Sequence, residues 1–164
     1  MLTLTFPIQN LSLEQLETEL SQNNIGLNAS AQKLLTDPRL VLSEHSHLQT
    51  IKIMTVADLN LQSSAILPNI FSAAQKQGLQ LCSLESAIYL RLFWKNQPES
   101  NDPAMHRQKA PDSSVTVASP IISTDPYQPK GFYLRNVNQK LWLRGYICDD
   151  VFVWQPEDQF AFQI

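Results

Sequence analysis

The 164-residue chain has few of the features that usually identify a function. It contains only two cysteines, Cys82 and Cys148, too few for a disulfide framework, so we expect two reduced thiols. No apolar run approaches the roughly 18–20 residues that a membrane helix needs. The first basic side chain is Lys33, so the amino terminus lacks the charged start of a secretory signal. These absences predict a soluble, cytoplasmic protein without membrane association, and export without a cleavable signal stays open.

Charged residues are also scarce, at 16% of the chain, and the formal net charge is −3. Such a chain has no general attraction for phosphate backbones or anionic lipid, which disfavours nucleic-acid binding. Its 43% of hydrophobic residues is typical of a globular protein. We therefore expect one domain over residues 1–164, with a division into a helix-rich lobe, 1–95, and a β-rich lobe, 114–164, as the alternative.

Helix signals dominate the first part of the sequence. Ser12 and Gln15 have the spacing of a capping box, which predicts a helix at 13–22. Asn28 can cap a second helix, which must end before Pro38 because proline disfavours helical geometry in the preceding residue. A two-helix unit is therefore expected to open the fold.

A central strand and helix follow. Alternating β-branched residues predict a strand at about 48–56. Pro68 suits the first turn of a helix that Gly78 ends, and Ser83 can cap one or two further turns. Residues 89–94 are interpreted as extended, with a continuing helix as the alternative.

The carboxyl-terminal part is rich in predicted strands. Residues 96–113 contain three prolines and almost no large apolar side chain, which is typical of a long exposed loop or a linker. Strands are then expected at 115–122, 131–146, 151–154 and 160–162. The sequence predicts an α+β fold with amino-terminal helices, a central strand and helix, and a carboxyl-terminal antiparallel β meander.

Residues 131–146 specify the strongest local structure, an aromatic hairpin. If Asn138 and Gln139 form a two-residue turn, Leu134 lies opposite Leu143, and the apolar residues share one face. The other face, named here the arginine-aromatic face, gathers the following five side chains: Tyr133, Arg135, Trp142, Arg144 and Tyr146.

The arginine-aromatic face is the main candidate for a binding surface. Arginine and tryptophan are enriched at binding hot spots, and exposed rings beside guanidinium groups can stack on a partner. The alternative is structural, because such cross-strand pairs also stabilise sheets and helices can cover them. Our first hypothesis is a non-enzymatic protein-binding module that uses this face, with its oligomeric state open.

Two other function classes are weaker. Cys82 and Glu85 lie at a predicted helix start, where a lowered thiol pKa would suit a small enzyme, but the pattern favours a buried inert thiol and a capping carboxylate. His45 and His47 would share a strand face and Asp58 supplies a distant carboxylate, but a zinc site needs three or four ligands with second-shell support, and Ser-His-Ser-His fits a hydrophilic turn equally well. We predict no metal and no cofactor.

One stretch carries a resemblance. Residues 78–85 read Gly-Leu-Gln-Leu-Cys-Ser-Leu-Glu, and Leu-Arg-Leu (90–92) and Gln-Pro (97–98) follow. This pattern resembles a group of uncharacterised bacterial proteins with Gly-Leu-x-Leu-Cys-Pro-x-Glu and then Leu-Arg-Leu, over about residues 11–162. The resemblance implies a small α+β domain and brings no activity.

The resemblance also singles out three polar positions, Cys82, Glu85 and Arg91, for a shared role. Ser83 departs from the proline of the group, and residues 99–111 look like an insertion.

Overall fold

The structure is a computed structural model that describes residues 1–106 and 108–164 and has an α+β fold, as the sequence predicts. Its main sheet contains β1 (Leu2–Ile8), β2 (Gly26–Leu27), β3 (His47–Thr55), β5 (Val115–Val117), β6 (Gly131–Val137), β7 (Lys140–Tyr146) and β9 (Gln159–Gln163). A small second sheet pairs β4 (Ala65–Ile66) with β8 (Val153–Trp154). The helices are α1 (Leu13–Gln22), α2 (Ala29–Leu35), α3 (Leu67–Lys76) and α4 (Leu84–Phe93), with a 3-10 turn η1 (Ala57–Leu59).

Local capping signals set the helix starts. The Ser12 side chain accepts a hydrogen bond from the Gln15 amide, and Gln15 Oε1 accepts one from the Ser12 amide, which confirms the capping box of α1. Asn28 caps α2 as predicted. Gly78, with a φ of 82°, follows the end of α3 in the left-handed conformation expected for it.

The fourth helix is longer than the sequence predicts. Ser83 caps α4, and the helix continues to Phe93, so the extended interpretation of residues 89–94 is wrong and the helical alternative is correct. Its residues are buried from Leu84 to Arg91, including the polar Glu85, Ser86 and Arg91, so no exposed polar face marks a helical period. The first strand, β1, was missing from the sequence prediction altogether.

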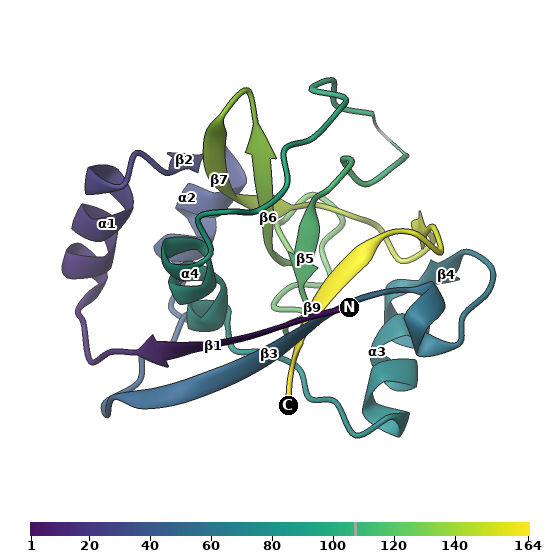
Figure 1. The fold of residues 1–164 in the computed structure, drawn as a ribbon, viewed down its shortest axis with the longest axis horizontal. Coiled ribbons are helices and arrows are strands. Elements are labelled where there is room, and N and C mark those ends of the chain that lie inside the picture. Colours follow the sequence, from purple (N-terminus) through teal and green to yellow (C-terminus); the bar gives the residue numbers. More distant parts are fainter. Residues whose placement is uncertain (107) are drawn as a thin grey trace.

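The main sheet has the order β1-β3-β9-β5-β6-β7-β2 (Figure 1). Strands β5, β6 and β7 form a consecutive antiparallel run. The last strand, β9, does not extend that run beside β7 but lies between β3 and β5, antiparallel to the first and parallel to the second. Strands from both sides of the 96–113 loop therefore share one sheet.

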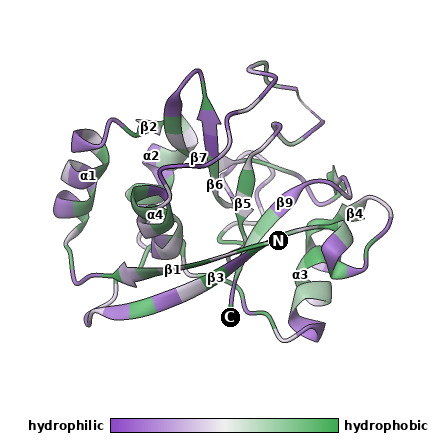
Figure 2. Cartoon of the chain, viewed as in Figure 1, coloured by the Kyte–Doolittle hydropathy of each residue, from purple (hydrophilic) through white to green (hydrophobic). Residues whose placement is uncertain are grey.

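Two hydrophobic clusters pack on the sheet. The larger one takes residues from α1, α2 and α4 with the inward side chains of β1, β3 and β6. The smaller one joins α3 to an aromatic group from β6 to β9. Figure 2 shows the hydrophobic colour concentrated on α4, β5 and β9. No described helix has the length and apolar character needed to cross a membrane.

The 96–113 loop is not fully exposed, which corrects the sequence prediction. Gln97 and Ser100 are buried, and the Ser100 amide donates to the Asn136 carbonyl at 2.8 Å. Asn136 Nδ2 in turn donates to the Gln97 carbonyl at 2.8 Å. Short polar side chains thus hold the loop to the hairpin, and hydrogen bonds of this kind leave no mark in a hydropathy pattern.

A close contact joins α2 to β7. The Asn28 side chain accepts from the Gly145 amide at 2.9 Å and donates to the Gly145 carbonyl at 3.1 Å. A Cβ at position 145 would come within 2.7 Å of the Ser30 carbonyl carbon and 2.9 Å of the Ala31 amide nitrogen. The approach of α2 therefore requires glycine at this position.

Gly145→Ala should lower the free energy of unfolding by about 1–3 kcal/mol, the usual cost of an added carbon in a packed site, because the clashing atoms are backbone. Chemical denaturation measures the loss. Gly78→Asn is the control, since its side chain meets no atom within 4 Å and asparagine tolerates the left-handed conformation. Equal losses in the two variants would contradict the role of the contact.

Candidate functional site

The hairpin has the predicted register. Tyr133 pairs with Arg144, Leu134 with Leu143 and Arg135 with Trp142. The turn residues Asn138 and Gln139 have φ of 53° and 60°, which is the conformation of a type I′ turn. The arginine-aromatic face therefore exists as the sequence describes it.

That face is largely covered. The exposed fraction is only 6% for Tyr133, 1% for Arg135 and 7% for Tyr146. The other two side chains, Trp142 and Arg144, are half-buried. The covering segment is the 96–113 loop, together with β8 and the start of α2. A flat docking surface made of all five side chains is thus absent from this structure.

Arg135 is held by the loop. Its Nη2 donates to the Asp102 carbonyl at 2.8 Å, and Nη1 lies 2.9 Å from the Met105 sulfur. Burial lowers the pKa of Arg135, partly offset by the charges of Tyr133 and Asp102. Arg135 therefore anchors the loop rather than facing a partner.

Trp142 is packed from both sides. A Cβ on Gly26 would lie 2.4 Å from the indole ring, so the ring rests directly on the backbone of β2. The Arg144 guanidinium lies 4.3 Å from the ring centroid and the Lys140 amine 5.1 Å from it. Such cation-π contacts contribute roughly 0.5–1 kcal/mol each at exposed sites.

Trp142→Ala should lower the free energy of unfolding by roughly 1–3 kcal/mol, less than the 3–5 kcal/mol of a fully buried aromatic, because one ring face packs on β2 and the rest is partly solvated. Chemical denaturation checks this value. Lys140→Ala, which removes one cation-π contact, should lower the free energy of unfolding by no more than about 0.5–1 kcal/mol. A loss for Trp142→Ala as small as that of Lys140→Ala would refute the packing on Gly26.

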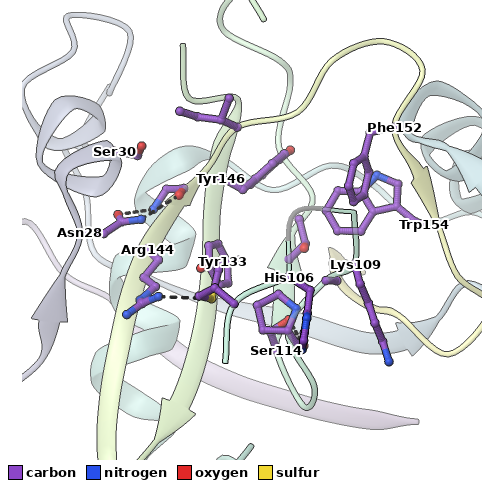
Figure 3. Close-up of a pocket in the computed structure, with 16 residues that line it drawn as sticks. Asn28, Ser30, His106, Lys109, Ser114, Tyr133, Arg144, Tyr146, Phe152 and Trp154 are labelled. Atoms are coloured by element: carbon purple, nitrogen blue, oxygen red, sulfur yellow. Dashed lines mark hydrogen bonds between the residues drawn. The ribbon is translucent and has the colours of Figure 1, made fainter. Parts of the chain in front are cut away.

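A cavity of about 390 Å³ lies beside the other half of the face (Figure 3). Four aromatic side chains line it, from β6, β7, β8 and the segment before β8. Its lining comprises Asn28, Ser30, Met105, His106, Lys109, Ala110, Pro111, Ser114, Thr116, Tyr133, Arg144, Gly145, Tyr146, Ile147, Phe152 and Trp154. This volume lies within the range of small-molecule sites.

Two buried polar groups of the lining have no partner. Tyr146 Oη and Trp154 Nε1 make no hydrogen bond to any described residue, although both side chains are more than 90% buried. Burial raises the pKa of Tyr146, so its hydroxyl keeps its proton at neutral pH. A buried group without a partner costs free energy.

The basic lining side chains are His106, Lys109 and Arg144, and no described lining residue is Asp or Glu. His106 Nε2 lies 2.7 Å from the Asp102 carboxylate, which lowers the pKa of Asp102. Ser114 Oγ donates to the Pro111 carbonyl at 2.6 Å and not to His106. Among the described residues, the cavity therefore holds no hydroxyl hydrogen-bonded to this histidine as a nucleophile would be.

The structure places Cys82 in the core, away from this cavity. It is 1% exposed, its sulfur lies 3.6 Å from the Ala161 carbonyl oxygen, and burial raises the pKa of its thiol to about 12. A thiol in this state is a poor nucleophile at neutral pH. The geometry favours the inert interpretation of Cys82.

Glu85 and Arg91 also have structural partners. The Glu85 carboxylate accepts hydrogen bonds from the amide and hydroxyl of Ser43. Arg91 is fully buried, and its Nη1 donates to Gln97 Oε1 at 2.5 Å, while Gln97 Nε2 donates to the Leu134 carbonyl at 3.1 Å. Burial lowers the pKa of Arg91 to about 10. Glu85 thus ties α4 to the segment between α2 and β3, and Arg91 ties it through Gln97 to β6.

The Cys82 thiol should make stability fall as pH rises above 8. The unfolded chain releases this proton near its ordinary pKa of 9.0 and the folded chain only near 12, so raising the pH favours the unfolded state. Between pH 8 and 10 the group accounts for about 1 kcal/mol of lost stability. Between pH 8 and 10, chemical denaturation of Cys82→Ala should show a loss of stability smaller than that of the parent by this amount. Equal losses in the two proteins would contradict the effect of burial on the thiol.

The histidine pair has no third ligand. His47 Nδ1 lies 3.1 Å from the His45 carbonyl, and the Asp58 carboxylate accepts from the Thr55 amide at 2.9 Å, at the start of η1. That backbone bond is the main cause of the lowered pKa of Asp58. In the part of the chain that the structure describes, no three His, Cys, Asp or Glu side chains group as metal ligands.

Sequence reasoning missed three important residues of the cavity. Asn28 was assigned only to capping, and its second role depends on contact with Gly145, which is 117 positions away. Phe152 and Trp154 were assigned to a strand without any link to the hairpin, although Trp154 lies edge-on to Tyr146 at 5.9 Å. The sequence signal for these two residues is an aromatic pair in a short segment. Such a pair does not show which distant residues it contacts.

Comparison of the chain with protein-family models, with curated proteins and with solved structures gives no significant match. The functional argument therefore rests on the geometry of the chain itself.

Proposed function

We propose that the chain is a non-enzymatic binding module whose site is the cavity beside the arginine-aromatic face. The observation that carries the proposal is a cavity of about 390 Å³ that combines four aromatic side chains with three basic ones, and none of its described lining residues is Asp or Glu. A concave site lined by aromatic side chains with a few polar groups is typical of ligand binding.

A small ligand fits the geometry better than the broad protein partner that the sequence suggested. Broad docking needs exposed hot-spot side chains, and Tyr133, Arg135 and Tyr146 are buried. A concave, half-open site lined by aromatic side chains and a few polar groups is typical of small-molecule recognition.

The enzyme alternative has less support. Its centre, Cys82, has a pKa of about 12 and lies in the core. Membership in the bacterial group with the Gly-Leu-x-Leu-Cys-Pro-x-Glu pattern stays a hypothesis and adds no activity to the proposal.

A fragment screen by ligand-observed NMR tests the site. Ile147 lines the cavity and is 50% exposed, so Ile147→Trp should block the cavity at little cost to folding. Val151, at 76% exposure, is outside the lining, so Val151→Trp is the matched control. We expect fragments that bind the parent and the Val151 variant and fail to bind the Ile147 variant.

The absence of such fragments would refute the proposed site. So would hits that bind the Ile147→Trp protein as well as they bind the parent.

A further inference from the structure

We infer that the cavity binds a planar aromatic acid, with its carboxylate on Arg144 and its ring among the aromatic side chains. This inference rests on the proposed function and names the chemical class of the ligand.

The charge of the cavity selects an anion. None of the described residues that line it is Asp or Glu, whereas the chain as a whole has 15 acidic and 12 basic side chains. A cavity with basic groups and low-dielectric walls attracts negative ligands despite the negative net charge.

Arg144, whose guanidinium lies 4.3 Å from the Trp142 ring centroid, supplies a cation without a described carboxylate partner. Its only described hydrogen-bond contact is a weak one, from Nη1 to the Met105 sulfur at 3.7 Å, and its Nε is buried without a partner. The ion pairs among the described residues join Asp37 to Arg39 and Asp102 to His106, so Arg144 has no carboxylate partner there. A guanidinium has five N–H donors in a planar fork that matches a carboxylate.

The other basic groups are less suited to this role. The Asp102 carboxylate oxygen already lies 2.7 Å from His106 Nε2. Figure 3 shows the Lys109 side chain extending away from the aromatic rings. Arg135, on the same hairpin face, is outside the lining and is held by the Asp102 carbonyl. Arg144 is therefore the anchor for the acid group.

The aromatic wall selects a planar ring. Tyr146, Phe152 and Trp154 meet edge to face, with centroids 5.0 Å apart for Phe152 and Trp154, and they line the same cavity as Tyr133. A planar ring packs against such side chains.

Isothermal titration with 4-hydroxybenzoate, and with its neutral analogue 4-hydroxybenzamide, tests the inference. The acid should bind the parent more tightly than the amide. Arg144→Gln should weaken acid binding roughly tenfold or more, the loss of a charge-assisted hydrogen bond, and leave the amide unchanged. Arg144→Lys, which keeps the charge and loses the fork, should fall between the parent and the Gln variant.

Lys140→Gln is the matched control. Lys140 also lies over the Trp142 ring but is outside this cavity, so this variant should bind the acid within about twofold of the parent. A thermal melt of each variant separates lost binding from lost folding.

Equal binding of acid and amide, or an Arg144→Gln protein that binds the acid as the parent does, would overturn the inference. Binding of phenyl phosphate in place of 4-hydroxybenzoate would overturn the carboxylate assignment and favour a phosphate ligand. If neither anion binds, but fragments are found that bind the parent and not the Ile147→Trp protein, the ligand class is wrong and the proposed function stands. If no fragment depends on Ile147, both are wrong.

Discussion

The side-chain amide of Asn28 is the contact on which the arrangement of this fold depends. One oxygen accepts from the Ala31 amide, which starts α2, and from the Gly145 amide on β7, while the nitrogen donates to the Gly145 carbonyl. A single side chain thus caps a helix and pairs with a strand. The contact requires glycine at position 145, because a Cβ there would meet the backbone of Ser30. It brings the helical unit against the hairpin and forms one wall of the cavity.

The loop between α4 and β5 forms the opposite wall. It is attached by Gln97, which accepts from the buried Arg91 and donates to the Leu134 carbonyl, and by Ser100 and Asp102, which contact the hairpin. Arg91 has no described carboxylate partner, so its charge is stabilised by neutral acceptors near the carboxyl end of α4, where the helix dipole favours a cation. The polar residues of the Leu-Arg-Leu region therefore shape the site without lining it.

The hairpin illustrates what a local pattern can predict. Two-residue alternation and a two-residue turn specify the pairing from Gly131 to Tyr146, and the structure has this pairing. The same pattern does not indicate which other segments of the chain pack on the arginine-aromatic face. Arg135 became a buried anchor, Trp142 a ring packed on Gly26, and Arg144 a half-buried cation beside a cavity, because three different segments reach the face. One face of the hairpin therefore supplies a residue that anchors the loop, a ring that packs on β2 and a cation beside the cavity.

The sequence by itself determined the local elements: the capping box at Ser12, the caps at Asn28 and Ser83, the end of α3 at Gly78, and the register of the hairpin. Each depends on hydrogen bonds or steric limits within a few residues, so neighbours along the chain carry the information. The tertiary structure alone decided the insertion of β9 between β3 and β5, the helical state of residues 89–93 and the cavity. These features depend on packing between segments as far apart as Asn28 and Gly145, and no local pattern records which distant segments meet.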